Sequence, residues 1–185
     1  MHLNDTNTRN SNMEYDQVYF WTDTIKGWKK LFTNDLYKQI ILDSFGELVS
    51  REMVKIYAFV IMPNHLHVIW EMKEPNGKEM PHASFNKFTS HSIAKDLKSK
   101  DPILLSNFLV DEPDRKLRIW QRDPLAVLMD TKKKAEQKID YLHLNPLQSH
   151  WNLANRPEDY KWSSAAFYEI GVDEFEFLTD YRDRF

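Results

Sequence analysis

The chain has 185 residues, of which 42% are hydrophobic and 29% charged, a composition typical of one soluble globular domain. It has no cysteine, which excludes disulfides and thiolate chemistry, and its four scattered glycines exclude Gly-rich phosphate loops. The net charge of −3 is uneven, because residues 113–138 hold eight basic and four acidic side chains, whereas residues 158–185 hold three and eight. Such runs are usually solvated helix faces, so charge alone assigns no partner.

Apolar side chains recur at strand or helix spacing along most of the chain, and turn residues separate the segments. Aromatic and β-branched runs predict strands, and apolar residues three or four positions apart behind a capping residue predict helices. In chain order the predicted elements are a strand over Val18–Thr24, a helix over Asp35–Ser50, strands over Val54–Ile61 and His65–Glu71, a helix from Ser84 to about Lys98, a strand over Arg115–Arg122, a basic helix over Thr131–Leu144 and a short helix from Ser163. This order predicts an α+β fold, the ferredoxin-like split β-α-β-β-α-β sandwich, in which the basic helix is added over the free sheet face.

The two ends of the chain are expected to differ from the body of the domain. Residues 1–13 are polar and lack the apolar core of a secretion signal, which predicts a flexible leader. A single catalytic domain is then expected over residues 14–185, with an acidic tail from about residue 169. The longest apolar run, Tyr57–Met62, is far shorter than the ~20 residues of a membrane helix, so no membrane partner is expected. The absence of cysteine suits a reducing cytoplasm.

His65 and His67 are the strongest local candidates for chemistry. On a strand, residues two positions apart point to the same face and lie about 6.6 Å apart. Two imidazoles so placed can bind one divalent ion at ~2.0–2.2 Å, and Glu71 shares their face. The alternative is a pair of half-buried histidines without a ligand, because a His-x-His pair often arises by chance.

Tyr141 and Asn145 are the second candidate pair, on the predicted basic helix. Residues four positions apart share a helix face, and Lys134 and Lys138 lie along the same stripe. A metal or lysine cation nearby would favour the phenolate, and the Asn145 amide oxygen could be a third metal ligand. The alternative is that Tyr141 belongs to the core and Asn145 caps the helix before Pro146.

Both pairs lie within blocks that resemble the HUH-type single-tyrosine transposases of the insertion-sequence-200-like group, most closely the branch called REP-associated tyrosine transposases. The similar blocks are Phe59–Ile69 (FVIMPNHLHVI), Lys138–Leu147 (KIDYLHLNPL) and Tyr160–Ala165 (YKWSSA). They occur in the family's order, and the resemblance spans roughly Val18 to Tyr168. The sequence departs from the branch at Leu144, which usually is a second asparagine, and at His150-Trp151, where a small residue is common.

The resemblance implies a DNA strand transferase that cleaves and rejoins single-stranded DNA next to a hairpin or palindromic repeat. It implies Mg²⁺ or Mn²⁺ held by His65, His67 and Asn145, with Tyr141 as the nucleophile that forms a 5′-phosphotyrosine. It also implies work in the bacterial cytosol, at the nucleoid, as a monomer or a homodimer. The basic side chains expected to contact DNA are Lys132, Lys133, Lys134, Lys138, Arg118 and Arg122.

Two other functions remain open at this stage. A ferredoxin-like sheet with exposed aromatic residues can bind single-stranded nucleic acid without catalysis. A metal phosphoesterase would use the same histidines to activate water and would form no covalent intermediate. A domesticated enzyme that cuts repeats without moving an element would share every feature of a mobile transposase.

Overall fold

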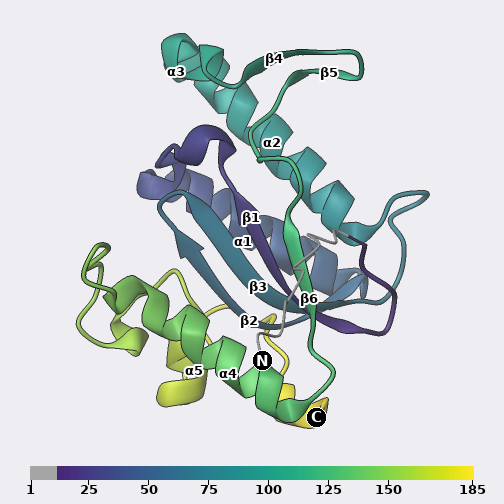
Figure 1. The fold of residues 1–185 in the computed structure, drawn as a ribbon, viewed down its shortest axis with the longest axis vertical. Coiled ribbons are helices and arrows are strands. Elements are labelled where there is room, and N and C mark those ends of the chain that lie inside the picture. Colours follow the sequence, from purple (N-terminus) through teal and green to yellow (C-terminus); the bar gives the residue numbers. More distant parts are fainter. Residues whose placement is uncertain (1–11) are drawn as a thin grey trace, which may run out of the picture.

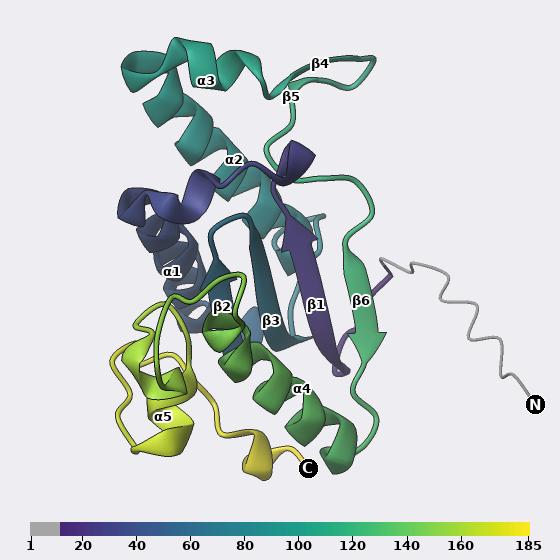
Figure 2. The same ribbon diagram turned by 60° about the vertical axis from the view of Figure 1, so that its left-hand side comes forward.

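An antiparallel four-stranded sheet forms the centre of the protein, in a computed structural model that describes residues 12–185. Helices α1 and α2 cover one face of the sheet, and α4 crosses the opposite face (Figure 1; Figure 2). The strands are β1 Val18–Thr24, β2 Val54–Met62, β3 His65–Met72, β4 Leu109–Glu112, β5 Arg115–Leu117 and β6 Leu125–Leu128, and the helices are α1 Asp35–Ser50, α2 Pro81–Lys100, α3 Pro102–Ser106, α4 Lys132–Leu144 and α5 Ala165–Glu169.

The order of the strands confirms the predicted ferredoxin-like arrangement. The sheet runs β2-β3-β1-β6, so the two central strands are β1 and β3, and β3 pairs antiparallel with both β1 and β2. The predicted bounds of β1 and α1 agree with the structure, and β2 and β3 each extend one residue further than predicted. Helix α2 begins at Pro81 rather than Ser84, because proline suits the first turn of a helix.

The prediction for the fourth strand of the sheet is wrong. Arg115–Arg122 does not join the sheet, since only Arg115–Leu117 is a strand and it pairs with β4 in a separate hairpin. Arg118 turns back onto Glu112, with which it forms an ion pair. The edge position beside β1 is taken by Leu125–Leu128, an uncharged apolar run whose first three side chains are partly buried.

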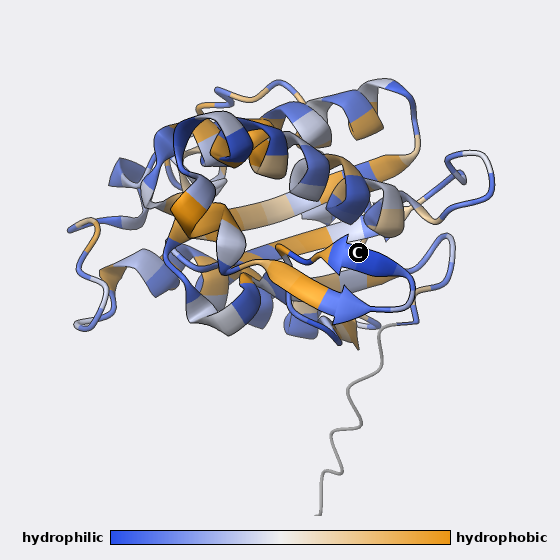
Figure 3. Ribbon diagram, turned by 90° about the horizontal axis from the view of Figure 1, so that it is seen from above, coloured by the Kyte–Doolittle hydropathy of each residue, from blue (hydrophilic) through white to orange (hydrophobic). Residues whose placement is uncertain are grey.

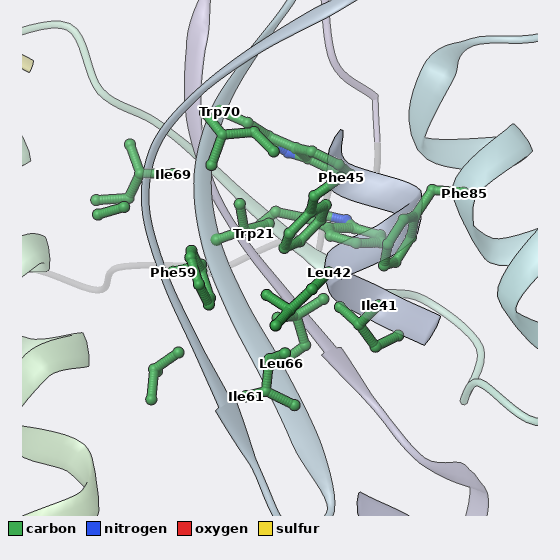
Figure 4. Packing of buried hydrophobic residues seen from close by; sticks show 14 of the residues in the cluster. Trp21, Ile41, Leu42, Phe45, Phe59, Ile61, Leu66, Ile69, Trp70 and Phe85 are labelled. Carbon is green, nitrogen blue, oxygen red and sulfur yellow. The ribbon is translucent and has the colours of Figure 1, made fainter. Parts of the chain in front are cut away.

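An aromatic cluster fills the space between the sheet and helices α1 and α2 (Figure 4). Trp21 stacks on Trp70 with ring centroids 4.8 Å apart, and Phe45 stacks on Phe85 at 5.1 Å. All four side chains are buried. Hydrophobic segments are concentrated along the strands, whereas hydrophilic residues alternate with them on the helices (Figure 3). Because neighbouring residues of a strand point to opposite faces, this packing turns the next residues of β1 and β3 toward α4.

The segment after α4 returns to the edge of the sheet and packs along β2. The Ile61 N–H donates to the Trp162 carbonyl at 2.9 Å, and the Thr179 N–H donates to the Ile56 carbonyl at 2.8 Å. Phe177 is buried against Phe45. The acidic tail expected from about residue 169 therefore contributes apolar side chains to the core.

The expected leader, residues 1–13, falls mostly outside the described residues. Met13, its last residue, is buried and belongs to the hydrophobic core. Among the helices of residues 12–185, none is both long and apolar enough to cross a membrane.

Candidate functional site

Strands β1 and β3 bring the two predicted histidines to the sheet face that α4 covers. Thr22 lies directly opposite His67 in the antiparallel register, and Thr24 lies opposite His65. Cross-strand partners share a face of the sheet, so all four side chains are neighbours. The ring centroids of the two histidines are 4.7 Å apart, which confirms the prediction that strand spacing puts both imidazoles together.

Helix α4 carries Tyr141 to the same place. The helix begins after Thr131, whose side-chain oxygen accepts a hydrogen bond from the Lys134 N–H, as an N-cap residue does. Its apolar stripe, which includes Ile139 and Leu142, is buried against the sheet. Tyr141 lies at the edge of this stripe, 43% exposed, with its ring centroid 5.4 Å from that of His67.

All four residues predicted to perform chemistry line one open hollow of about 320 Å³. The α-helix ends at Leu144, and a 3-10 turn over Asn145–Leu147 follows, so Asn145 is buried at the inner end of α4. The lining residues are Thr22, Thr24, Trp28, Asn64, His65, His67, Tyr141, Asn145, Gln148, His150 and Trp151. The structure therefore joins the two sequence motifs, which are far apart along the chain, in one site.

Hydrogen bonds determine which ring nitrogen of each histidine is free. The Asn64 amide nitrogen donates to the Trp28 carbonyl at 3.4 Å, which leaves its oxygen 2.7 Å from Nδ1 of His65. An amide oxygen can only accept, so His65 carries its proton on Nδ1 and a lone pair on Nε2. Nδ1 of His67 lies 2.7 Å from the Thr22 hydroxyl, and its Nε2 is buried with no hydrogen-bond partner among residues 12–185. Both rings can thus offer Nε2 as a ligand atom.

Both histidines are neutral at neutral pH. Burial, with a smaller contribution from the nearby His150, lowers the pKa of His65 to about 4. Burial also lowers the pKa of His67 well below its usual value, with smaller contributions from His65 and Lys138. Neutral imidazole is the form that binds a metal ion, so the site does not have to release protons from these rings before binding one.

The donor atoms in the hollow fit a divalent cation that keeps open coordination positions. No group of three or more His, Cys, Asp or Glu side chains that could hold a metal ion occurs within residues 12–185. The Asn145 amide lines the hollow beside the two imidazoles, so its oxygen can serve as a third ligand atom. Such a set leaves room for water or phosphate, unlike a closed structural zinc site.

Glu71, the additional candidate ligand, is occupied elsewhere. Its carboxylate accepts a hydrogen bond from the Tyr57 hydroxyl at 2.5 Å and pairs with Lys73 and Arg184, each at 3.3 Å. These contacts tie β3 to β2 and to the C-terminal end of the chain, so Glu71 has a structural role.

Lys138 is the only one of the six predicted DNA-binding residues that contacts the site among the described residues. Its Nζ lies 5.3 Å from the Tyr141 ring centre and 4.9 Å from that of Phe20. Lys132 and Lys133 are exposed at the other end of α4, roughly 12 Å along the helix axis at 1.5 Å per residue. Neither forms an ion pair within the part of the chain that the structure describes.

The other three predicted DNA-binding residues are paired with acidic side chains. Lys134 contacts Asp130 at 2.8 Å, and both Arg118 and Arg122 pair with Glu112. A nucleic-acid phosphate would have to compete with Asp130 or Glu112 for these three basic side chains. The sequence pattern did not indicate these ion pairs.

Three aromatic residues of the hollow were not recognised in the sequence. His150 and Trp151 stand out in the sequence only as a departure from the similar family, and Trp28 lies outside every predicted element. The Trp151 ring centroid lies 5.9 Å from that of His65. All three residues lie in irregular segments, where neither strand nor helix periodicity indicates which way a side chain points. Trp120 and Trp162, in contrast, are buried.

Comparison with known proteins supports the fold. No protein-family model matches the chain, and no curated protein sequence matches it significantly. Among solved structures, that of a REP-associated tyrosine transposase bound to a REP hairpin covers 92% of this chain and 92% of its own, with a TM-score of 0.59 and 18% sequence identity. The chain therefore has the fold of a REP-associated tyrosine transposase.

Proposed function

We propose that the protein is a metal-dependent DNA strand transferase that cleaves and rejoins single-stranded DNA next to a hairpin. The observation that carries the proposal is the one hollow in which two neutral histidines, Tyr141 and Asn145 meet, where Nε2 of His67 is buried and has no hydrogen-bond partner within residues 12–185. A nucleophile beside a ready set of metal ligands is the arrangement that phosphoryl transfer needs. The similarity in fold to a transposase bound to a hairpin agrees with this chemistry.

In the proposed reaction, the phenolic oxygen of Tyr141 attacks the phosphorus atom of a phosphodiester. A bond between that oxygen and phosphorus forms while the bond from phosphorus to the 3′ oxygen breaks. The phenolic proton passes to solvent, and the departing 3′ oxygen takes up a proton to become a free hydroxyl. When a 3′-hydroxyl later attacks the same phosphorus, Tyr141 leaves, so the strand is rejoined with no net loss of a phosphodiester bond and no ATP.

The surrounding residues each have a part in this proposal. His65, His67 and Asn145 would hold Mg²⁺ or Mn²⁺, which when bound polarises a phosphoryl oxygen and stabilises the developing charge. Lys138, whose Nζ lies 5.3 Å from the centre of the Tyr141 ring, provides a positive charge beside that ring. The exposed Lys132 and Lys133 lie further along α4, where they can neutralise phosphates of the bound strand.

The test is the formation of a covalent adduct. The protein, Mn²⁺ and a labelled single strand with a hairpin should give a protein–DNA product that survives SDS, with the label on the peptide that contains Tyr141. Tyr141→Phe removes only the nucleophilic oxygen, so this variant should bind DNA and form no adduct. Tyr15→Phe is a matched control, because Tyr15 is 37% exposed and does not line the hollow.

The same experiment separates the other two functions. Cleavage that continues in Tyr141→Phe without any adduct would indicate a phosphoesterase that activates water. Binding without cleavage or adduct in the wild-type protein would indicate a non-catalytic binding module. Cleavage that continues undiminished in EDTA would exclude the metal site, whatever the role of Tyr141.

A further inference from the structure

Trp28 is the most exposed Trp, Tyr or Phe side chain in residues 12–185, at 61%. It follows β1 in a short 3-10 turn over Lys26–Trp28. Its φ is +57°, and the preceding Gly27 has a φ of +67°. The left-handed region is unfavourable for a bulky side chain, and the other described non-glycine residues found there are all Asp, Asn or Glu. Trp28 is thus a large apolar side chain that is exposed to solvent and has an unfavourable backbone conformation. Neither feature stabilises the fold, which indicates that the side chain serves another function.

Trp28 stands at the border of two hollows. One is the candidate site, and the other has a volume of about 150 Å³ and is lined by Thr22, Asp23, Thr24, Trp28, Gln121, Arg122, Asp123, Pro124 and Leu125. The side-chain oxygen of Gln121 is buried and has no hydrogen-bond partner in the described part of the chain. A buried amide oxygen without a partner is costly, and it suits a ligand that supplies the missing donor.

The same turn is bonded to the candidate site. The Trp28 carbonyl accepts from the Asn64 amide that orients His65, and the Ile25 N–H donates to the Asn64 carbonyl at 2.9 Å. The backbone that carries the indole is therefore held at a fixed position relative to the two histidines. A base stacked on it would belong to a nucleotide close to the reacting phosphate.

We infer that Trp28 is a stacking platform for one unpaired nucleobase beside the cleaved phosphodiester, and that the hollow at Gln121 receives the edge of that base. The inference rests on the proposed function for its substrate, single-stranded DNA. Every base has an aromatic face, so an exposed indole holds unpaired bases with little sequence preference. A glutamine amide offers a donor and an acceptor, so it adds preference for the base whose edge matches it. Arg122, 63% exposed at the rim, can neutralise an adjoining phosphate.

The first measurement is binding, by fluorescence anisotropy of a labelled hairpin with a single-stranded flank. It uses proteins that also carry Tyr141→Phe, so that cleavage does not interfere. Trp28→Ala should weaken binding roughly 5- to 100-fold, the range expected for one stacked base. Phe88→Ala is the matched control, because Phe88 is 54% exposed but lines neither hollow, and it should change affinity by less than about twofold.

A second variant separates binding from folding. Trp28→Gly relieves the left-handed backbone, so its melting temperature should equal or exceed that of Trp28→Ala while its affinity for DNA is equally low. If Trp28 were only a packing residue, Trp28→Gly would lose stability and affinity together.

The third measurement moves an abasic nucleotide along the single-stranded flank. With Trp28 intact, one position should weaken binding markedly, and in Trp28→Ala the same position should have no further effect, because the two changes remove one contact. Equal affinity of Trp28→Ala and its parent, or the same abasic profile in both, would overturn the inference. Because binding is measured without cleavage, failure of the Tyr141 adduct leaves it intact, whereas absence of any DNA binding rejects both proposals.

Discussion

Asp23→Asn should stabilise the protein at neutral pH. Asp23 is 1% exposed at the end of β1, on the face toward α2. Its carboxyl oxygens accept hydrogen bonds from the Asn86 side chain and the Thr24 N–H, both at 2.8 Å, and no cation pairs with it in the described structure. Burial raises the pKa of Asp23 to about 8, and the two hydrogen bonds only partly oppose this effect. The folded protein therefore keeps this carboxyl neutral.

The size of the effect follows from the two pKa values. In the unfolded chain Asp23 ionises above its usual pKa of 3.8, and in the folded protein above about 8. At pH 7 the Asp23 carboxylate is ionised in the unfolded chain and must take up a proton when the protein folds. Because pH 7 lies about three units above the unfolded pKa, and each unit corresponds to 1.36 kcal/mol, this protonation costs about 4 kcal/mol. The contribution of Asp23 to the free energy of unfolding is therefore most favourable below pH 3.8. It falls as the pH rises toward 8 and no longer changes above about pH 8, where the folded carboxyl ionises too. Asparagine has nearly the same shape and does not titrate.

Urea unfolding from pH 4.5 to 8 measures this directly. The free energy of unfolding of Asp23→Asn should exceed that of the wild type by only about 1 kcal/mol at pH 4.5 and by about 4 kcal/mol at pH 7. The new amide needs an acceptor, and Asn86 can rotate to offer its side-chain oxygen, which is buried without a partner among residues 12–185. Asp111→Asn, at a side chain that is 100% exposed, should stay within ~0.5 kcal/mol of wild type at each pH. A difference that does not change with pH, or a variant less stable than wild type at pH 8, would refute the reasoning.

Three further outcomes are expected. Thr22→Val removes the hydroxyl that holds His67 and should weaken Mn²⁺ binding about 10- to 100-fold in titration calorimetry, with folding retained. The double variant Lys132→Ala/Lys133→Ala should release close to two fewer counterions on binding a hairpin, which lowers the slope of log affinity against log salt concentration. An unchanged slope would exclude phosphate contacts at these two lysines. Thr131→Ala should destabilise the protein by about 1 kcal/mol in urea, and Thr131→Ser should restore the cap.

The periodicity of apolar residues was sufficient to predict the bounds of elements that pack on the aromatic cluster. Val18–Thr24 and Asp35–Ser50 have the predicted bounds because Trp21 of the strand and Phe45 of the helix both pack against Trp70. The pattern failed at Arg115–Arg122, where Ile119 and Trp120 are buried but the flanking arginines are held outside the sheet by ion pairs. A short apolar segment can be predicted to be buried, but its sequence does not indicate which element it packs against.

The candidate site shows the same division. His65 and His67 could be predicted to lie together because a strand has a period of two, and Tyr141 and Asn145 because a helix brings every fourth residue to one face. That the two pairs meet depends on α4 crossing the free face of the sheet, which the order of elements implies. Trp28 could not be found this way, because its direction is determined by two successive left-handed residues rather than by any repeat.

Burial explains how a polar site persists beneath a helix. His65, His67 and Asn145 are 8%, 5% and 3% exposed, and polar groups so buried are unfavourable unless each has a partner. Thr22 and Asn64 provide hydrogen-bond partners for the Nδ1 atoms of the two histidines. The Nε2 atom of each ring then keeps a lone pair with which it can bind a ligand. Filling the site with apolar side chains of similar volume would remove these unfavourable groups and stabilise the fold. The polar residues thus reduce stability at the point where the sheet, α4 and the Trp28 turn meet, as expected of residues retained for binding and chemistry rather than for folding.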